Sequence, residues 1–206
     1  YLAQVGRPEA PPSPPLNIVG DFGGGGMMLA FGIAAALFDA QRTGRGRVVD
    51  CAMVDGVGLM MGNFYSPGAR LGPRGTNSLD SGRPFYEVYQ TADGKYMAVG
   101  ATGTDLYARM MKTLGIDLSD LPDQFDPDGW PEVRRRLSAV FATKTRAEWS
   151  EIFATVDAAV TPVLGPYEAP EHPQHQARGV FVDAGGFLEP GPAPRFYQLE
   201  DPEDAT

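Results

Sequence analysis

The sequence predicts an α/β fold, and three observations carry that prediction. Residues 16–19 read as a short buried strand, and the apolar pattern over residues 27–38 reads as a helix. The run "RVVDCAMV", residues 47–54, reads as a strand that passes into a second apolar helix over residues 53–64. Strand, helix, strand, helix is the alternation of a parallel α/β layer. The last observation is the segment "FYEVYQTADGKYMAVG", residues 85–100. It has two aromatic and β-branched runs around Asp93-Gly94, which is a strong hairpin signal.

The elements after the hairpin follow from local signals. Residues 104–114 have the pattern of an amphipathic helix, and Pro131 suits the first turn of a helix over residues 132–142. Thr145 and Glu148 have the spacing of a capping box for a third helix. The segment "VTPVL", residues 160–164, is predicted to be an edge strand, because its proline cannot donate a ladder hydrogen bond.

Composition excludes several functional classes. The 17 basic and 26 acidic residues give a net charge of −9, which argues against binding a nucleic-acid backbone. The one basic cluster, residues 134–136, is expected on a solvated helix face. Cys51 is the only cysteine, which leaves no intrachain disulfide and fits a reducing compartment. The apolar run Met27–Phe38 is shorter than the roughly 20 residues of a membrane span, so a buried core helix is expected there and no span.

Two histidines have a spacing that could bring metal ligands together. His172 and His175 are three residues apart, but Pro173 lies between them and no third histidine or second cysteine exists in the chain. A surface role at a helix end is therefore expected, and no metal site.

Asp21 stands directly before the run Phe22-Gly23-Gly24-Gly25-Gly26. Aspartate is a favoured helix N-cap, and that interpretation stays open. However, a plain cap requires no run of four glycines, each of which weakens regular structure. A carboxylate beside free backbone N–H groups at a helix start is what a site needs where negative charge develops. The alternative is thus an acid/base or nucleophilic carboxylate joined to an oxyanion-binding loop.

A family resemblance covers most of residues 16–196. The blocks "PPLNIVGDFGGGGM", "RTGRGRVVDCAMVDG", "GRPFYEVYQTADGKYMAVGA", "DAAVTPVL" and "APRF" resemble, in order, the α-methylacyl-CoA racemases of the family III CoA-transferase superfamily. The resemblance implies a large Rossmann-like parallel domain and a small α/β domain. It also implies two long linkers and a homodimer interlocked like linked rings.

Composition shifts place this family's domains on the chain. Residues 1–53 would be a remainder of the large domain, and residues 54–84 an inter-domain linker. Residues 85–178 would form the small domain, and residues 179–206 the return linker and the start of a C-terminal large-domain segment. The first residue, Tyr1, reads as the middle of a longer chain, so we expect this chain to lack an N-terminal part.

The resemblance implies a reaction and a role for Asp21. Such racemases invert C2 of 2-methylacyl-CoA thioesters by moving the α-proton through an enolate, with one aspartate and one histidine as bases. The family's aspartate falls on Asp21, and Gly23, Gly24 and Gly25 would bind the enolate oxygen. Val19, Phe22 and Met27 would supply apolar surroundings.

No metal or organic cofactor is expected, since CoA is part of the substrate. The expected location is cytoplasmic, or peroxisomal or mitochondrial in a eukaryote.

Two departures from the family matter. The catalytic histidine belongs to a "GHDINY"-like segment of which Tyr1 is the last letter, so that base lies outside this chain. A glutamate expected after "AVGA" is replaced by Gly103, and Asp105 is the nearest carboxylate. Arg70 and Arg74 are weak candidates for the anionic CoA handle, against a plain solubilising role.

Two other functions stay open at this point. Superfamily relatives that move CoA between carboxylic acids use the same aspartate as a nucleophile, and the missing glutamate favours this alternative. A third possibility is a non-catalytic dimerisation module in which Asp21 only caps a helix.

Overall fold

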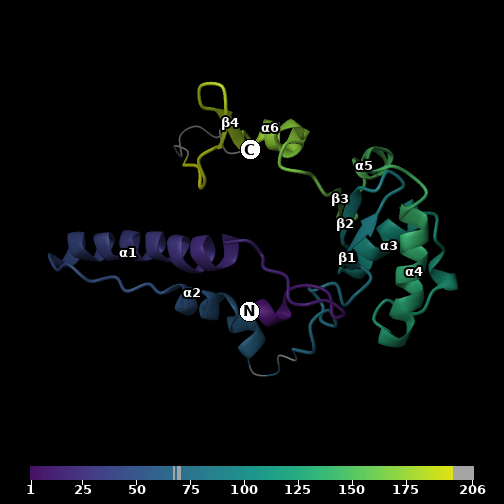
Figure 1. Ribbon diagram of the computed structural model, residues 1–206, viewed down its shortest axis with the longest axis horizontal. Helices are drawn as coiled ribbons and strands as arrows, with labels where there is room; N and C mark the ends of the chain where they lie inside the picture. The colour runs from purple at the N-terminus through teal and green to yellow at the C-terminus, as the bar shows by residue number, and fades with distance from the viewer. Residues whose placement is uncertain (67, 69–70, 197–206) are drawn as a thin grey trace. The chain divides into compact units, whose positions relative to one another are not determined.

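The computed structural model describes residues 1–66, 68 and 71–196 (Figure 1). The chain divides into two compact units, Tyr1–Pro162 and Val163–Thr206. The first unit holds a pair of apolar helices and a small sheet with its own helices. The second unit holds short elements only. The domain boundaries expected from composition stay a prediction, and residues 197–206 of the last predicted segment lie outside the described residues.

The apolar helices begin with a wide turn. After a 3-10 turn, η1 (Leu2–Gln4), and the proline-rich segment, a π-helix η2 (Ile18–Met27) continues directly into α1 (Met28–Thr43). Gly44 ends α1 in the left-handed conformation, with φ of 68°, and residues 45–52 are extended. The shorter α2 (Met53–Met60) follows, and a 3-10 turn, η3 (Gly62–Tyr65), ends this region (Figure 1).

Helices α2 and η2 pack at very short range through two glycines. Gly24 and Gly56 are both buried, and a Cβ atom on Gly56 would lie 2.0 Å from the carbonyl oxygen of Gly24. Only glycine at position 56 permits this approach.

Two predicted strands do not form in the described part of the chain. Leu16 and Asn17 make a turn, and Ile18 already belongs to the π-helix, so the strand over residues 16–19 is wrong. Residues 47–52 are extended but have no strand partner, and Val48 is 97% exposed. The hydrophobic pattern of both segments suits a strand, but a strand requires a neighbouring strand, and neither segment has one here.

The predicted burial of the apolar helix is also wrong within this chain. Helix α1 has no buried residue, and Phe31 is 75% exposed. The joined helix Ile18–Thr43 has 26 residues, and a window of it reaches a mean hydropathy of 1.4 with 6% of the window buried. Among the described residues this one helix is long and apolar enough to cross a membrane. That is weak support for a span, since core helices of soluble proteins pass the same test.

The small sheet has the predicted hairpin at its centre. Strands β1 (Tyr86–Gln90) and β2 (Tyr96–Gly100) are antiparallel, with Tyr86 opposite Gly100, and Gly94 takes a φ of 75° in the turn. Strand β3 (Val160–Pro162) pairs antiparallel with β2 and completes the order β1-β2-β3. Its proline therefore lies in an edge strand, as predicted.

Three helices cover one face of this sheet (Figure 1). They are α3 (Thr104–Thr113), α4 (Trp130–Phe141) and α5 (Arg146–Phe153), linked by the 3-10 turns η4 (Leu118–Asp120) and η5 (Pro127–Gly129). Phe85, Met97, Met110, Leu137 and Phe141 are fully buried between the sheet and the helices. The predicted capping box of Thr145 and Glu148 starts α5. The hairpin turn and this capping box are local signals that the sequence carries.

The second unit contains η6 (Ala169–Glu171), α6 (Pro173–Ala177) and the antiparallel pair β4 (Phe181–Asp183) and β5 (Leu188–Pro190). The two predicted histidines lie here. His172 caps α6 by accepting a hydrogen bond from the N–H of Gln174, and the ring of His175 contacts the carbonyl of Ala169 at 2.6 Å. The helix-end role is thus confirmed. The described residues contain no group of three metal-ligating side chains.

Candidate active site

Asp21 lies inside helix η2 and not at its cap. The N-cap is Asn17, whose carbonyl oxygen accepts a hydrogen bond from the N–H of Asp21 at 3.2 Å. The Asp21 side chain is exposed, and among the described residues its carboxylate has no hydrogen bond or ion pair. This placement contradicts the plain N-cap interpretation. It leaves a free carboxylate in the first turn of a long helix.

The glycine run after Asp21 is helical, where an open loop was expected. Gly23, Gly24 and Gly25 lie within the π-helix, in which each N–H pairs with the carbonyl five residues earlier. A Cβ atom on Gly24 would lie 2.9 Å from the Met53 carbonyl oxygen and from a methyl group of Val57. One purpose of the run is therefore close packing against α2, which the sequence alone did not reveal. Oxyanion binding by these three residues stays a prediction.

The apolar side chains expected around Asp21 are present but open to solvent. Val19 is half-buried, whereas Phe22 is 60% exposed and Met27 is 62% exposed. On the inner side of the run, the Cys51 thiol contacts the carbonyl oxygen of Gly25 at 3.6 Å. The described residues thus support the helix from one side and leave its Asp21 side uncovered.

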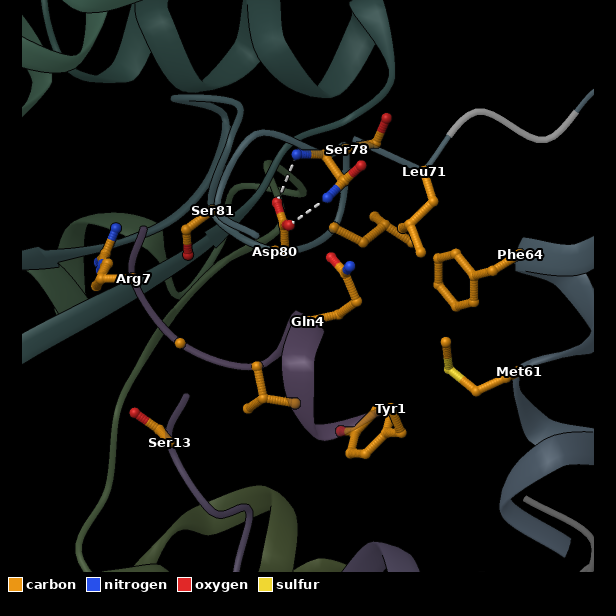
Figure 2. Close-up of a pocket in the computed structure, with 14 residues that line it drawn as sticks. Tyr1, Gln4, Arg7, Ser13, Met61, Phe64, Leu71, Ser78, Asp80 and Ser81 are labelled. Carbon is orange, nitrogen blue, oxygen red and sulfur yellow. Dashed lines mark hydrogen bonds between the residues drawn. The ribbon is translucent and has the colours of Figure 1, made fainter. Parts of the chain in front are cut away.

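A cavity of about 460 Å³ lies near the C-terminal end of α2 (Figure 2). It is bounded by the N-terminal segment 1–13, by the residues after α2 and by the loop 71–81. Most of its lining is apolar, from Tyr1, Val5, Met61, Phe64, Leu71 and Leu79. Figure 2 shows the Gln4 side chain between Asp80 and Tyr1, and its carbonyl oxygen is buried without a hydrogen-bond partner. The cavity combines an apolar lining with one unsatisfied acceptor.

The end of α2 connects the glycine run with the cavity. The Met60 methyl group lies 3.4 Å from where a Cβ atom on Gly23 would be, and the next residue, Met61, lines the cavity. A shift of α2 would therefore alter both.

The cavity loop is held together by one carboxylate. Asp80 accepts hydrogen bonds from the N–H groups of Gly75 at 2.8 Å, Asn77 at 2.7 Å and Gly82 at 3.2 Å. It also accepts one from the side-chain amide of Asn77 at 2.6 Å. Because the loop lacks regular secondary structure, these bonds replace a ladder and fix its shape.

Arg74 fastens the N-terminal segment to this loop. Its guanidinium donates to the carbonyl oxygens of Arg7 and Ala3, each at 3.1 Å, and to that of Ala10. Three of the five guanidinium N–H donors of Arg74 are thus used within the protein, and its role toward the CoA handle stays a prediction. Arg70, the other arginine considered for the handle, lies outside the described residues.

A buried ion pair network behind the cavity was missed by sequence reasoning. The Glu87 side chain is 3% exposed and accepts two hydrogen bonds from Arg7, at 2.5 and 2.7 Å, and a third from Arg134. Burial by itself would raise the pKa of the Glu87 carboxyl. The hydrogen bonds from Arg7 and from the Val88 N–H, with the arginine charges, hold that pKa below its ordinary value.

The basic cluster 134–136 is therefore divided. Arg135 and Arg136 do form salt bridges with Glu132 on the exposed side of α4, as a solvated face would. Arg134 points the other way, toward Glu87, so the expected solvated role is wrong for this residue. Helix α4 has a side near β1 and a side near solvent, and the sequence run alone does not separate them.

Asp105, considered in place of the family glutamate, was expected to reach the partner subunit's site, and that role stays a prediction. Gly103 is the N-cap of α3, and Asp105 lies in its first turn, exposed. Neither residue lines the cavity. Within the described chain, Asp21 is thus the one predicted catalytic side chain at the glycine run.

Comparison with known proteins identifies a family over nearly the whole chain. The family model of CoA-transferase family III matches residues 1–197. The chain is 45% identical over 197 residues to α-methylacyl-CoA racemase of Mus musculus and 44% identical over 198 residues to that of Homo sapiens, covering 94% of this chain and 52% of each relative. The chain spans about half the length of these curated relatives.

Solved structures share the fold. A protein of Mycobacterium tuberculosis matches with a TM-score of 0.70 and 18% identity over 95% of this chain and 54% of that one. A CaiB/BaiF family protein of Brucella suis matches with a TM-score of 0.70 and 20% identity over 95% of this chain and 53% of its own. With a family match over nearly the whole chain and a shared mixed fold of helices and sheets, this chain belongs to CoA-transferase family III.

Proposed function

We propose that the full-length protein carrying this chain is a racemase that inverts C2 of 2-methylacyl-CoA thioesters by 1,1-proton transfer. One observation of the structure carries the proposal: Asp21 is a carboxylate without a partner among the described residues, in the first turn of a helix, and the glycines that follow Phe22 pack on α2. The identity of 45% and 44% to proteins named α-methylacyl-CoA racemase supports the same reaction.

Asp21 would accept the α-proton of the thioester and return it. A carboxylate without competing donors is available as a base, and the transfer requires that C2 come within hydrogen-bond reach and that the enolate be stabilised. Removal of the proton places negative charge on the thioester oxygen. Asp21 lies near the positive end of the helix dipole of Ile18–Thr43, which also favours negative charge there. The N–H groups of Gly23, Gly24 and Gly25 are our candidates to bind that oxygen, for which they would have to leave their hydrogen bonds within the π-helix when substrate binds.

The cavity near Met61 is our candidate for the acyl group. Its lining is mostly apolar, as an alkyl chain requires, and it continues from the same helix end that contacts Gly23. Tyr1 lies on its wall, and the histidine base would precede Tyr1 in the full-length protein. Asp21 does not line the cavity, so the substrate would extend from the cavity past the contact of Met60 with Gly23 to reach both bases.

The remaining parts of the protein would complete the site. We propose that a Rossmann-like layer covers the exposed apolar side of α1, and that two copies interlock as a dimer. The exposure of Phe31 and Met27 supports such a cover, since isolated chains seldom leave so much apolar surface open.

This reaction requires no metal and no organic cofactor, because the thioester itself makes the α-proton acidic. We place the protein in the cytoplasm, or in a peroxisome or mitochondrion of a eukaryote.

The second candidate is transfer of CoA between carboxylic acids, with Asp21 as nucleophile. One observation favours it: Gly103 replaces the glutamate that racemases are expected to carry. In this reaction the Asp21 carboxylate would attack the thioester carbonyl and release CoA as thiolate, while C2 keeps its proton.

Incubation of the full-length protein with (2S)-2-methylacyl-CoA in heavy water separates the two reactions. A racemase incorporates deuterium at C2 with loss of configuration. A transferase exchanges the acyl group with labelled free acid and leaves C2 undeuterated. Acyl exchange without deuteration would therefore overturn the racemase proposal. Asp120→Asn, an exposed aspartate in the first turn of η4, is a control variant that leaves either activity unchanged.

A further inference from the structure

Glu87 connects three segments that are far apart in the sequence. It lies on β1 and receives Arg7 from the N-terminal segment and Arg134 from α4. Arg134 in turn donates to the carbonyl oxygens of Ser81 at 2.8 Å and Gly82 at 3.1 Å. One buried carboxylate thus holds a strand, a helix and two loop segments together.

Two of these segments are the walls of the cavity. Arg7 and Ser81 both belong to the cavity lining, one on the N-terminal side and the other on the loop side. Figure 2 shows the two residues on the same side of the cavity, near Asp80. Arg7 contacts Glu87 directly and the Ser81 carbonyl is linked to it through Arg134, so this carboxylate joins the two walls at the side of the cavity where they meet. The contacts of Arg74 act on the same N-terminal segment but do not reach the small sheet.

Loss of the Glu87 charge would release both arginines at once. A half-exposed Arg7 gains water and leaves its position, whereas Arg134 is left beside an uncharged partner. Ser81 has a φ of 70°, which a non-glycine residue rarely adopts, so its conformation depends on being held. The Ser81 carbonyl is held by Arg134. The loop wall is therefore the part that we expect to relax first.

We propose that Glu87 is a positioning residue for acyl-CoA binding: through Arg7 and Arg134 it fixes the two walls of the cavity in the spacing that accepts the acyl group. This inference rests on the proposed function, because it takes the cavity as the place of the acyl group. Glu87 touches neither Asp21 nor the cavity space, so its effect is on binding and not on the proton transfer itself.

The chain offers a matched control on α4. Glu132 is also a carboxylate shared by two arginines, Arg135 at 2.8 Å and Arg136 at 2.7 Å. These three residues all belong to α4, and none of them lines the cavity. Glu132→Gln therefore removes a carboxylate shared by two arginines, as Glu87→Gln does, but leaves the cavity walls unchanged.

The test compares Glu87→Gln with Glu132→Gln in the full-length protein. Titration with 2-methylacyl-CoA measures the Kd directly, and amide hydrogen exchange follows residues 1–13 and 71–82 without any substrate. We expect Glu87→Gln to weaken binding by about tenfold or more, since hydrogen bonds to a charged partner are lost. The same variant should exchange faster in both segments. Racemisation should show a raised KM with kcat within about threefold of wild type.

Each outcome bears on the inference separately from the reaction. An unchanged Kd and unchanged exchange in Glu87→Gln would overturn it, as would a lowered kcat with KM unchanged, or equal effects in Glu132→Gln. If Glu87→Gln does not fold, Arg134→Lys replaces it, because lysine keeps the charge near Glu87 but cannot also hold the carbonyls of Ser81 and Gly82. Absence of racemisation in the wild type would contradict the proposed function, whereas the titration and the exchange would still decide the positioning.

Discussion

Replacement of Gly56 by alanine perturbs the contact that supports the glycine run. The new Cβ atom would lie 2.0 Å from the carbonyl oxygen of Gly24, 2.6 Å from its carbonyl carbon and 2.7 Å from its Cα. These are backbone atoms, so no side chain can rotate away. Ordinary contact begins near 3.4 Å, and 3.4 minus 2.0 leaves 1.4 Å by which α2 and η2 must separate. We expect a net loss of about 1–3 kcal/mol, the usual cost of overpacking.

A second glycine on the same helix makes the control. A Cβ atom on Gly58 would meet no other atom within 4 Å, so Gly58→Ala gains helix propensity without a clash. It should stabilise the protein by about 0.4–1 kcal/mol. Urea unfolding of the full-length protein measures both variants. If Gly56→Ala is as stable as Gly58→Ala, the reasoning from close helix packing is refuted. If packing does position the run, Gly56→Ala should also slow deuteration of the substrate at C2.

Three further predictions concern the small sheet and its helices. Phe141→Ala removes a fully buried ring and should lower the free energy of unfolding by about 3–5 kcal/mol in a denaturant titration; a loss below about 1 kcal/mol would contradict the assigned core. Thr145→Ala removes the side-chain half of the capping box and should cost about 1 kcal/mol, whereas Thr113→Ala, at a half-buried position at the end of α3 that caps no helix, should cost less. The pKa of Glu87 is lower in the folded state than its ordinary value of 4.5, so the stability that it contributes is present above about pH 4.5 and is lost as pH falls through the folded-state pKa. Thermal unfolding from pH 7 to pH 3 should therefore show a steeper loss for wild type than for Glu87→Gln, and parallel curves would contradict this assignment.

The sequence predicted the parts of the fold that depend on near neighbours. The Asp93-Gly94 turn, the Thr145 cap and the proline of β3 each carry their own chemistry within a few residues, and the structure confirms all three. The hairpin also fixes its register through the turn, so the sheet follows from it.

Elements that depend on distant partners were predicted less well. The strand expected over residues 16–19 has the right composition, but the helix-forming run after it extends backwards to Ile18 and no strand lies beside it. The helix α1 was expected to be buried because it is apolar. Among the described residues, Val49 packs against Gly32 on one side of α1, but no residue of the helix is buried, since burial is set by the rest of the fold and not by the helix itself.

The candidate site also combines residues that local sequence identifies with residues that depend on distant partners. Asp21 and the glycines stand out locally, and the structure keeps them adjacent in η2. Glu87 carries no local signal, because a glutamate in a strand that alternates with apolar residues reads as solvent-facing. Its burial depends on Arg7, 80 positions earlier, and on Arg134, 47 positions later. Such long-range pairing is invisible to periodicity.

The most direct test of the central claim is the configuration and deuterium content of C2 after both enantiomers of 2-methylacyl-CoA are incubated in heavy water with wild type and with Asp21→Asn. We predict that the wild type deuterates C2 and racemises either enantiomer. Asp21→Asn should invert neither, because inversion requires a base on each face of C2. Retained deuteration of one enantiomer without inversion would assign the second base to the opposite face. Inversion by Asp21→Asn at the wild-type rate would contradict the account.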